Sequence, residues 1–225
     1  MALILTINTA FETAYIILSR NKEIIAEAQS SSQKDHASFL EPAIKKICTS
    51  QKINLKNIEA ISVINGPGSF TGLRVGLSSV KALCYALKKP LILLNTLDVM
   101  ACALKLQSPV KQENILFCPL IDARRMEVYT ALYNNNLTLI SNYSAKILDS
   151  FFLEEERNTD NIIIAGGSGS PKLQKISNNG NILYKNPLLL TKPAVILSDE
   201  AFTSKNFSDV VYSEPFYLKP VYFRK

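Results

Sequence analysis

The segment 66–76 carries the pattern with the clearest chemical meaning in the chain. Its glycines follow an apolar run at 60–64 and precede apolar residues at helical spacing, so they form a turn between a strand and a helix. Glycine permits positive φ and the close approach of another backbone. Ser69 or Thr71 can cap the helix by accepting a backbone N–H, and such a helix N-terminus can bind phosphate. No Gly-Lys-Ser/Thr follows the last glycine, so the turn is not a P-loop. A tight packing turn is therefore the favoured reading, and a phosphate cradle is the alternative.

The helix after this turn combines an apolar stripe with small residues. Gly72, Gly76 and Ser79 lie at helical intervals. Small side chains let a second element approach closely, and that element is either the chain's own sheet or another protein. We expect this helix, together with a helix that starts near His36 and includes Leu40, to form a surface for a partner.

The other polar candidates are weaker. His36 is the single histidine, so the chain lacks a histidine pair for a metal and offers one candidate base to a hydrolase. No G-x-S-x-G motif accompanies it, and we expect a surface or capping role. Asp122 follows a strand and precedes two arginines, so an ion pair is expected and a substrate contact is the alternative. The Gly-Gly-Ser-Gly-Ser run at 166–170 resembles a nucleotide-binding turn, which is a common pattern.

Composition narrows the classes of protein. The net charge is +6, but the lysines are scattered and not interleaved with aromatic residues, which disfavours strong nucleic-acid binding by this chain alone. The cysteines form no C-x-x-C pair, so they are expected to be buried thiols in a reducing compartment. No apolar run reaches the length of a membrane span, and the N-terminus is a poor signal peptide. We expect a cytoplasmic protein without a membrane segment. The four cysteines are Cys48, Cys84, Cys102 and Cys118.

The elements around these residues predict an α/β protein of two lobes. Three apolar runs joined by tight turns indicate an antiparallel meander, and strand, helix, strand and helix then follow as a parallel extension. Asp35 can cap the early helix, in which Pro42 either causes a kink or delays the regular part. The first-lobe strands are expected at 2–8, 13–18, 24–26, 60–64 and 91–94. The helix after the glycine-rich turn is expected to end near residue 87, and another helix is expected to start at residue 96.

A polar stretch at 105–114 marks the expected lobe boundary, so the lobes are 1–106 and 107–225. In the second lobe, an Asn-Asn-Asn turn at 134–136 is typical of a hairpin. The tail at 216–223 is expected to be extended, with a return to the first lobe as one option. The second-lobe strands are expected at 115–117, 127–133, 137–143 and 162–165.

These segments together resemble a known family. The run Asn65-Gly66-Pro67-Gly68-Ser69-Phe70-Thr71-Gly72-Leu73-Arg74-Val75-Gly76 looks like the signature of the TsaB (YeaZ) family of tRNA threonylcarbamoyladenosine biosynthesis proteins. The resemblance covers residues 1 to about 133 and returns at 215–218. Further matches, in order, are His36 with Leu40 and Pro42, Thr96-Leu97, Ile121-Asp122-Ala123-Arg124 and Glu127-Val128-Tyr129.

The resemblance implies two ribonuclease H-like lobes of the acetate/sugar kinase, chaperone and actin superfold. It implies a non-catalytic subunit that pairs with its catalytic paralogue TsaD and with the ATPase TsaE. That set transfers a threonylcarbamoyl group to the adenosine next to the anticodon in tRNA. The chain would contact tRNA mainly through the complex, a homodimer is the alternative assembly, and no cofactor or metal is expected.

One departure from the superfold concerns nucleotide chemistry. Related sequences often have Asp-Thr at the end of the first strand, where this chain has Asn8-Thr9. A neutral amide cannot supply the carboxylate charge that metal and phosphate require, which argues against independent catalysis. The alternatives are an active kinase or peptidase of the superfold and a stand-alone RNA-binding protein. The expected interface or turn residues are Gly66, Pro67, Gly68, Ser69, Phe70, Thr71, Gly72, Arg74, Gly76, Ser79, His36 and Leu40, and a weak nucleotide contact stays open at Asn8, Thr9 and Asp122.

Overall fold

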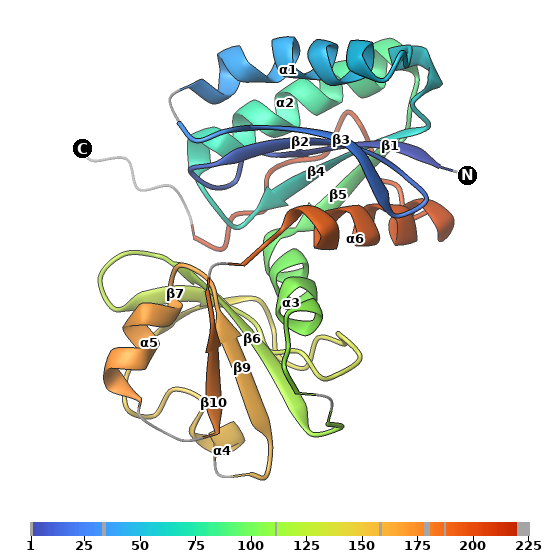
Figure 1. The fold of residues 1–225 in the computed structure, drawn as a ribbon. Coiled ribbons are helices and arrows are strands. Elements are labelled where there is room, and N and C mark those ends of the chain that lie inside the picture. The colour runs from blue at the N-terminus through green and yellow to red at the C-terminus, as the bar shows by residue number, and fades with distance from the viewer. Residues whose placement is uncertain are drawn as a thin grey trace, which may run out of the picture. The chain divides into compact units, whose positions relative to one another are not determined.

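The computed structural model describes residues 2–32, 35–110, 112–157, 159–177, 181–186 and 188–219. The chain divides into two compact units, each with its own five-stranded sheet (Figure 1). The first unit is Met1–Thr96 with Thr191–Phe216, and the second is Leu97–Leu190 with Tyr217–Lys225.

The sheet of the first unit has the order β3-β2-β1-β4-β5. Strands β1, β2 and β3 form the expected antiparallel meander, and β4 and β5 extend it in parallel. Every residue of β1 and β4 is buried, because both faces of these central strands are covered by helices. The bounds are β1 Leu3–Asn8, β2 Ala14–Arg20, β3 Glu23–Ser30, β4 Ala60–Gly66 and β5 Leu91–Asn95.

Helices cover both faces of this sheet. The helices α1 (His36–Ser50) and α2 (Phe70–Leu87) lie side by side on one face, and α6 (Thr191–Thr203) lies on the other (Figure 1). A short 3₁₀ turn, η2 (Leu55–Asn57), precedes β4. The apolar residues of α1 and α2 repeat at helical spacing and enter the core; they include Leu40, Ile44, Ile47, Leu73, Leu77 and Val80.

Two details of α1 differ from expectation. The helix begins at His36 and runs through Pro42, so a late start is wrong. Pro42 is exposed, and water can therefore satisfy the helix carbonyl that loses its donor. Asp35 occupies the N-cap position, but its side chain makes no capping hydrogen bond.

Buried hydroxyl groups join α6 to the sheet of the first unit. Ser62 Oγ donates to Thr6 Oγ1 at 2.8 Å and lies 2.7 Å from Ser198 Oγ. Ser198 Oγ in turn donates to the carbonyl of Ala194 at 2.7 Å. All three side chains are buried, and buried polar groups of this kind stabilise a fold when they find partners. These hydrogen bonds fix α6 on β1 and β4.

The sheet of the second unit has the order β10-β9-β6-β7-β8. β6, β9 and β10 are parallel, while β7 and β8 are antiparallel to their neighbours. The strands are β6 Ile115–Asp122, β7 Glu127–Thr130, β8 Ser144–Ile147, β9 Ile162–Gly166 and β10 Ile182–Lys185, and the helices are α3 Thr96–Leu106, α4 Glu154–Arg157 and α5 Ser170–Ile176.

The boundary between the units lies before Leu97 and not after residue 106. The reason is that α3 packs with the second unit. The hydroxyl groups of Tyr133 and Tyr143 both donate to Asp98 on α3, at 2.6 and 2.8 Å. The polar stretch at 105–114 therefore does not mark the division between the two units.

The predicted strand at 137–143 is wrong. The turn at Asn134 exists, since Leu137 N–H donates to its carbonyl at 2.9 Å. Leu137 has a φ of 62°, which interrupts an extended chain. The partner of β7 is instead β8 at 144–147. Of the expected extended tail, residues 220–223 lie outside the described residues, and 216–219 form neither helix nor strand.

The cysteines are buried, as the sequence predicts. Burial raises the pKa of the Cys84 and Cys118 thiols to about 12, so they stay protonated at neutral pH. None of the helices that the structure describes is long and apolar enough to span a membrane.

Candidate functional site

The glycine-rich turn packs against the chain's own backbone. A methyl group on Gly68 would lie 2.6 Å from the carbonyl oxygen of Ala10, and one on Gly72 would lie 2.0 Å from that of Thr9. Ser69 N–H also donates to the Ala10 carbonyl at 2.8 Å. The glycines are required because the segment after β1 approaches too closely for any side chain. This geometry favours the packing turn over the phosphate cradle, since carbonyl oxygens and not donors face these glycines.

A second approach fixes the start of the turn. Gly66 has a φ of 125°, and a methyl group there would lie 2.3 Å from the carbonyl oxygen of Phe216. Phe216 N–H donates to the Asn65 carbonyl at 2.8 Å. The segment at the end of the first unit therefore closes over the turn. Gly66 and Pro67 are buried, so neither offers a side of the turn to solvent.

The first turn of α2 is capped as the sequence predicts. Ser69 Oγ accepts a hydrogen bond from Gly72 N–H at 3.3 Å, and Ser69 is the N-cap residue. Thr71 is exposed within the helix and is not the cap. The Arg74 guanidinium lies 4.0 Å from the centre of the Phe70 ring, a cation–π contact that holds both side chains over the start of α2.

Several residues expected at an interface instead face the interior of the first unit. Thr9 Oγ1 donates to the Gly72 carbonyl at 2.7 Å, and a methyl group on Gly76 would lie 2.2 Å from the same oxygen. His36 and Leu40 are 2% and 3% exposed. The expectation that Gly72, Gly76, His36 and Leu40 form a partner surface is therefore corrected, because the first unit itself covers them.

His36 is not a surface residue either. Its Nε2 lies 3.0 Å from the carbonyl oxygen of Glu12, which ties the start of α1 to the loop between β1 and β2. Its Nδ1 is buried without a hydrogen-bond partner among the described residues. The ring thus holds the loop that also meets the glycines.

Asn8 supports the same loop from the end of β1. The side chain is 2% exposed, and its Oδ1 accepts a hydrogen bond from Ala10 N–H at 2.9 Å. This bond bends the chain so that the carbonyls of Thr9 and Ala10 face α2. A nucleotide contact at Asn8 or Thr9 stays a prediction.

The exposed side of the α1–α2 pair includes residues that were not among the expected interface residues. On α2 they are Ser78, Ala82, Tyr85 and Ala86, and on α1 they include Ala37, Glu41 and Lys45. The signal was available, because these positions lie opposite the apolar stripe. Of the interface residues expected from sequence, Thr71 and Arg74 are exposed and Ser79 is partly exposed.

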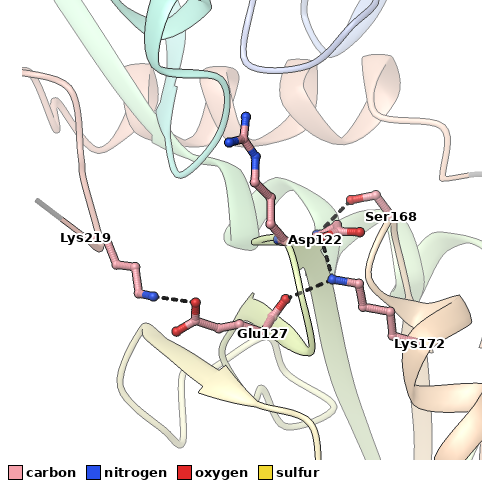
Figure 2. A network of polar contacts seen from close by, with 6 residues as sticks. Asp122, Glu127, Ser168, Lys172 and Lys219 are labelled. Carbon is pink, nitrogen blue, oxygen red and sulfur yellow. Dashed lines mark hydrogen bonds and ion pairs between the residues drawn. The ribbon is translucent and has the colours of Figure 1, made fainter. Parts of the chain in front are cut away.

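The second unit holds a polar cluster at the ends of β6 and β9 (Figure 2). Lys172 Nζ, on α5, donates to Asp122 Oδ1 at 2.6 Å, and Asp122 N–H donates to Ser168 Oγ at 3.0 Å. Lys219 pairs with Glu127 on β7. The ion pair expected at Asp122 is confirmed, although its partner is Lys172 and not a neighbouring arginine.

The electrostatics of this cluster favour an ionised Asp122. Partial burial raises the pKa of the carboxyl, but hydrogen bonds from the Lys172 ammonium and from Arg124 N–H, at 2.6 Å, outweigh it. The pKa of Asp122 therefore lies below its ordinary value. The glycine-serine turn at 166–170 supplies Ser168 to this cluster, so its polar groups are engaged within the unit.

Replacing Lys172 with Met tests this ion pair. We expect the free energy of unfolding at neutral pH to fall by up to about 1 kcal/mol, because both side chains are partly exposed to solvent. A lowered carboxyl pKa stabilises the fold above the ordinary value of 3.8 and loses that contribution as the pH falls below it. Urea unfolding of wild type and variant should therefore converge in acid. A constant difference across that range would contradict the ion pair.

Comparison with solved structures defines the class of protein. A Pseudomonas aeruginosa protein described as similar to the peptidase YeaZ superposes with a TM-score of 0.81 at 20% identity, over 97% of this chain and all of that one. YeaZ from the same organism gives a TM-score of 0.79 at 20% identity, with the same coverage of each chain. A polyphosphate/ATP-glucomannokinase from Arthrobacter gives 0.54 at 10% identity, over 89% of this chain and all of that one. The chain thus shares the two-unit α/β fold of YeaZ and, more distantly, of this sugar kinase, which confirms the predicted fold class.

Comparison with characterised sequences defines the family. The model of the family described as TsaD, tRNA N6-adenosine threonylcarbamoyltransferase, matches residues 23–214. The tRNA threonylcarbamoyladenosine biosynthesis protein TsaB of Buchnera aphidicola (strain APS) is 30% identical over 156 residues, which are 68% of each protein. TsaB of Bacillus subtilis is 32% identical over 130 residues, 58% of this chain and 54% of that protein. The matched regions thus span about half to two thirds of these relatives. The chain belongs to the TsaB (YeaZ) family.

Proposed function

We propose that this chain is an accessory subunit in the synthesis of threonylcarbamoyladenosine in tRNA. It docks on a TsaD-like catalytic paralogue, works with a TsaE-like ATPase and carries out no transfer itself. The names of its relatives support the pathway. The match to the TsaD family model supports a paralogous pair, because two proteins of one fold can join through equivalent surfaces. Such a subunit acts in the cytoplasm.

The observation that carries the proposal is the exposed side of α1 and α2. These helices lie side by side on one face of the first unit's sheet (Figure 1). Three of the six exposed positions on α2 are small: Ser78, Ala82 and Ala86. Small side chains allow another helix to pack closely, at the usual interaxial distance of about 8–10 Å or less. The face is therefore suited to a helix pair of a partner.

Two polar residues outside the glycine-rich turn, Asn8 and His36, support the accessory role. Asn8 places a neutral amide where related sequences often have a carboxylate, and its Oδ1 is engaged by Ala10 N–H. His36, the sole histidine, is buried against the Glu12 carbonyl. Neither side chain is placed to serve a reacting group at the surface.

Replacing Ala82 with Arg tests the docking face. We expect affinity for the purified TsaD-like paralogue to fall by about ten- to a hundredfold, because overpacking a close contact costs about 1–3 kcal/mol. The melting temperature should stay near that of wild type, since Ala82 is exposed. Calorimetric titration measures the affinity, and formation of the modified nucleoside by the reconstituted proteins measures function.

Two controls sharpen this experiment. Lys172→Met, in the second unit, should leave affinity for the paralogue unchanged. The chain alone, with tRNA and the activated threonylcarbamoyl donor, should form no product until the paralogue is added. Unchanged affinity of the Ala82→Arg variant, or product formation by the chain alone, contradicts the proposal.

A further inference from the structure

Two strongly exposed tyrosines lie on segments of the first unit that pack against each other. Tyr85, near the end of α2, is 80% exposed, and Tyr212, in the segment after α6, is 83% exposed. Exposed aromatic rings on a single surface are a common mark of a binding site. The two segments are far apart in the sequence, so their contact depends on the fold.

Lys81 and Asp209 fix the segment that carries Tyr212 against α2, the helix that carries Tyr85. Lys81 Nζ, one turn before Tyr85 on α2, donates to the carbonyls of Val211 and Ser213 at 2.8 and 2.9 Å. Asp209 Oδ1 accepts the backbone N–H groups of Val211 and Tyr212 at 2.6 and 2.8 Å. The backbone on both sides of Tyr212 is therefore fixed against α2, while its ring faces solvent.

A hollow lies beside Tyr85 at this end of α2. Its volume is about 570 Å³, and its lining is Cys84, Tyr85, Ala86, Lys88, Lys89 and Val210. The lining combines apolar residues with two lysines. This combination suits a flat, partly apolar ligand that carries negative charge.

Lys88 and Lys89, the two lysines that line the hollow, are not explained by the end of the helix alone. Cations near a helix C-terminus offset its exposed carbonyls. Here backbone groups already serve that purpose, since the N–H groups of Lys88 and Lys89 donate to the carbonyls of Tyr85 and Cys84 at 3.4 and 3.0 Å. Lys88 reaches this position with a left-handed φ of 55°. The ammonium groups are therefore left to act at the surface.

We propose that this tyrosine–lysine surface, formed by Tyr85, Lys88, Lys89 and Tyr212, binds single-stranded RNA. Aromatic side chains stack on unpaired bases, and lysines pair with the phosphates between them. A protein partner fits less well, because lysine is depleted from the cores of protein interfaces. The inference rests on the proposed function, whose tRNA substrate offers unpaired loop nucleotides.

The test uses the full chain and a short, fluorescently labelled, unstructured RNA. In anisotropy titrations at low salt we expect Tyr85→Ala/Tyr212→Ala to weaken binding by about tenfold or more, the effect of losing stacked bases. Lys88→Gln/Lys89→Gln should lower the slope of log K against log salt by about one for each lysine. Phe151→Ala, which removes an exposed aromatic from the second unit, is the matched control and should bind as wild type does.

Each result decides the proposal. Unchanged RNA binding by the double tyrosine variant overturns it, and so does a wild-type chain that binds RNA no better than that variant. If the variant keeps its RNA affinity but loses the TsaD-like paralogue, the surface is a protein contact and the proposal is also wrong. The Ala82→Arg variant distinguishes the docking-face proposal from the RNA proposal. If it loses affinity for the paralogue and keeps its RNA affinity, both proposals stand. If the double tyrosine variant loses RNA affinity but Ala82→Arg keeps its affinity for the paralogue, only the docking-face proposal is wrong.

Discussion

Replacing Gly72 with Ala is expected to lower the free energy of unfolding of the first unit by about 3 kcal/mol, at the upper end of the cost of overpacking. The added methyl group would lie 2.0 Å from the Thr9 carbonyl oxygen. The obstacle is backbone at the end of a fully buried strand, so it cannot move without disturbing β1. Thermal unfolding should show a decrease of about 6–12 °C in Tm for a chain of this size.

Gly76 provides a comparison at the same contact. A methyl group there would meet Thr9 Oγ1 at 2.2 Å, which belongs to a side chain and can be removed. In a Thr9→Ala background, Gly76→Ala should therefore lose most of its effect on the free energy of unfolding, whereas Gly72→Ala should keep most of its effect. Ser78→Ala, on the exposed side of α2, should change stability by less than about 0.5 kcal/mol. Equal rescue of both glycine variants would contradict the assigned contacts.

The order of elements in the first unit could be predicted because local patterns determine it. Short apolar runs with tight turns indicated the meander, and alternating strand and helix signals indicated the parallel extension. The Ser69 cap was also visible, since N-capping depends on neighbouring residues. The face to which the small residues of α2 turn was not visible, because Thr9, which follows β1 and is distant in the sequence, supplies the contact.

The second unit was harder for the same reason. Asp122 was expected to pair with a charged group, but Lys172 lies fifty positions later in the chain. The boundary after residue 106 followed a polar stretch, whereas the observed division depends on how α3 packs. The contact between α2 and the segment after α6 likewise depends on Lys81, which bonds to a carbonyl of that distant segment. Pairings between distant segments are set by tertiary structure, which a local pattern does not record.

Replacing Asp98 with Ala is expected to destabilise the second unit by about 2–3 kcal/mol. The change removes the acceptor of two tyrosine hydroxyl groups, those of Tyr133 and Tyr143. Tyr133 is 2% exposed, and a buried donor left without a partner costs about 1–3 kcal/mol. Urea unfolding monitored by tyrosine fluorescence measures the loss.

The matched background for Asp98→Ala is Tyr133→Phe/Tyr143→Phe, in which the hydroxyl groups are already absent. There the same substitution should cost less than about 1 kcal/mol, since no donor is left without a partner.

The pH dependence gives a second check. Burial, and then the charge of Asp98, raise the pKa of Tyr133 and Tyr143 above the ordinary value of 10.0. A tyrosine whose pKa is raised in the folded state makes its whole contribution to the free energy of unfolding below pH 10.0. Above that pH the unfolded chain binds fewer protons than the folded one. The contribution is therefore lost as the pH rises toward the pKa of the folded state. The difference between wild type and Asp98→Ala should therefore narrow above pH 10.0, and a difference that stayed constant or widened would show that Asp98 does not interact with these tyrosines.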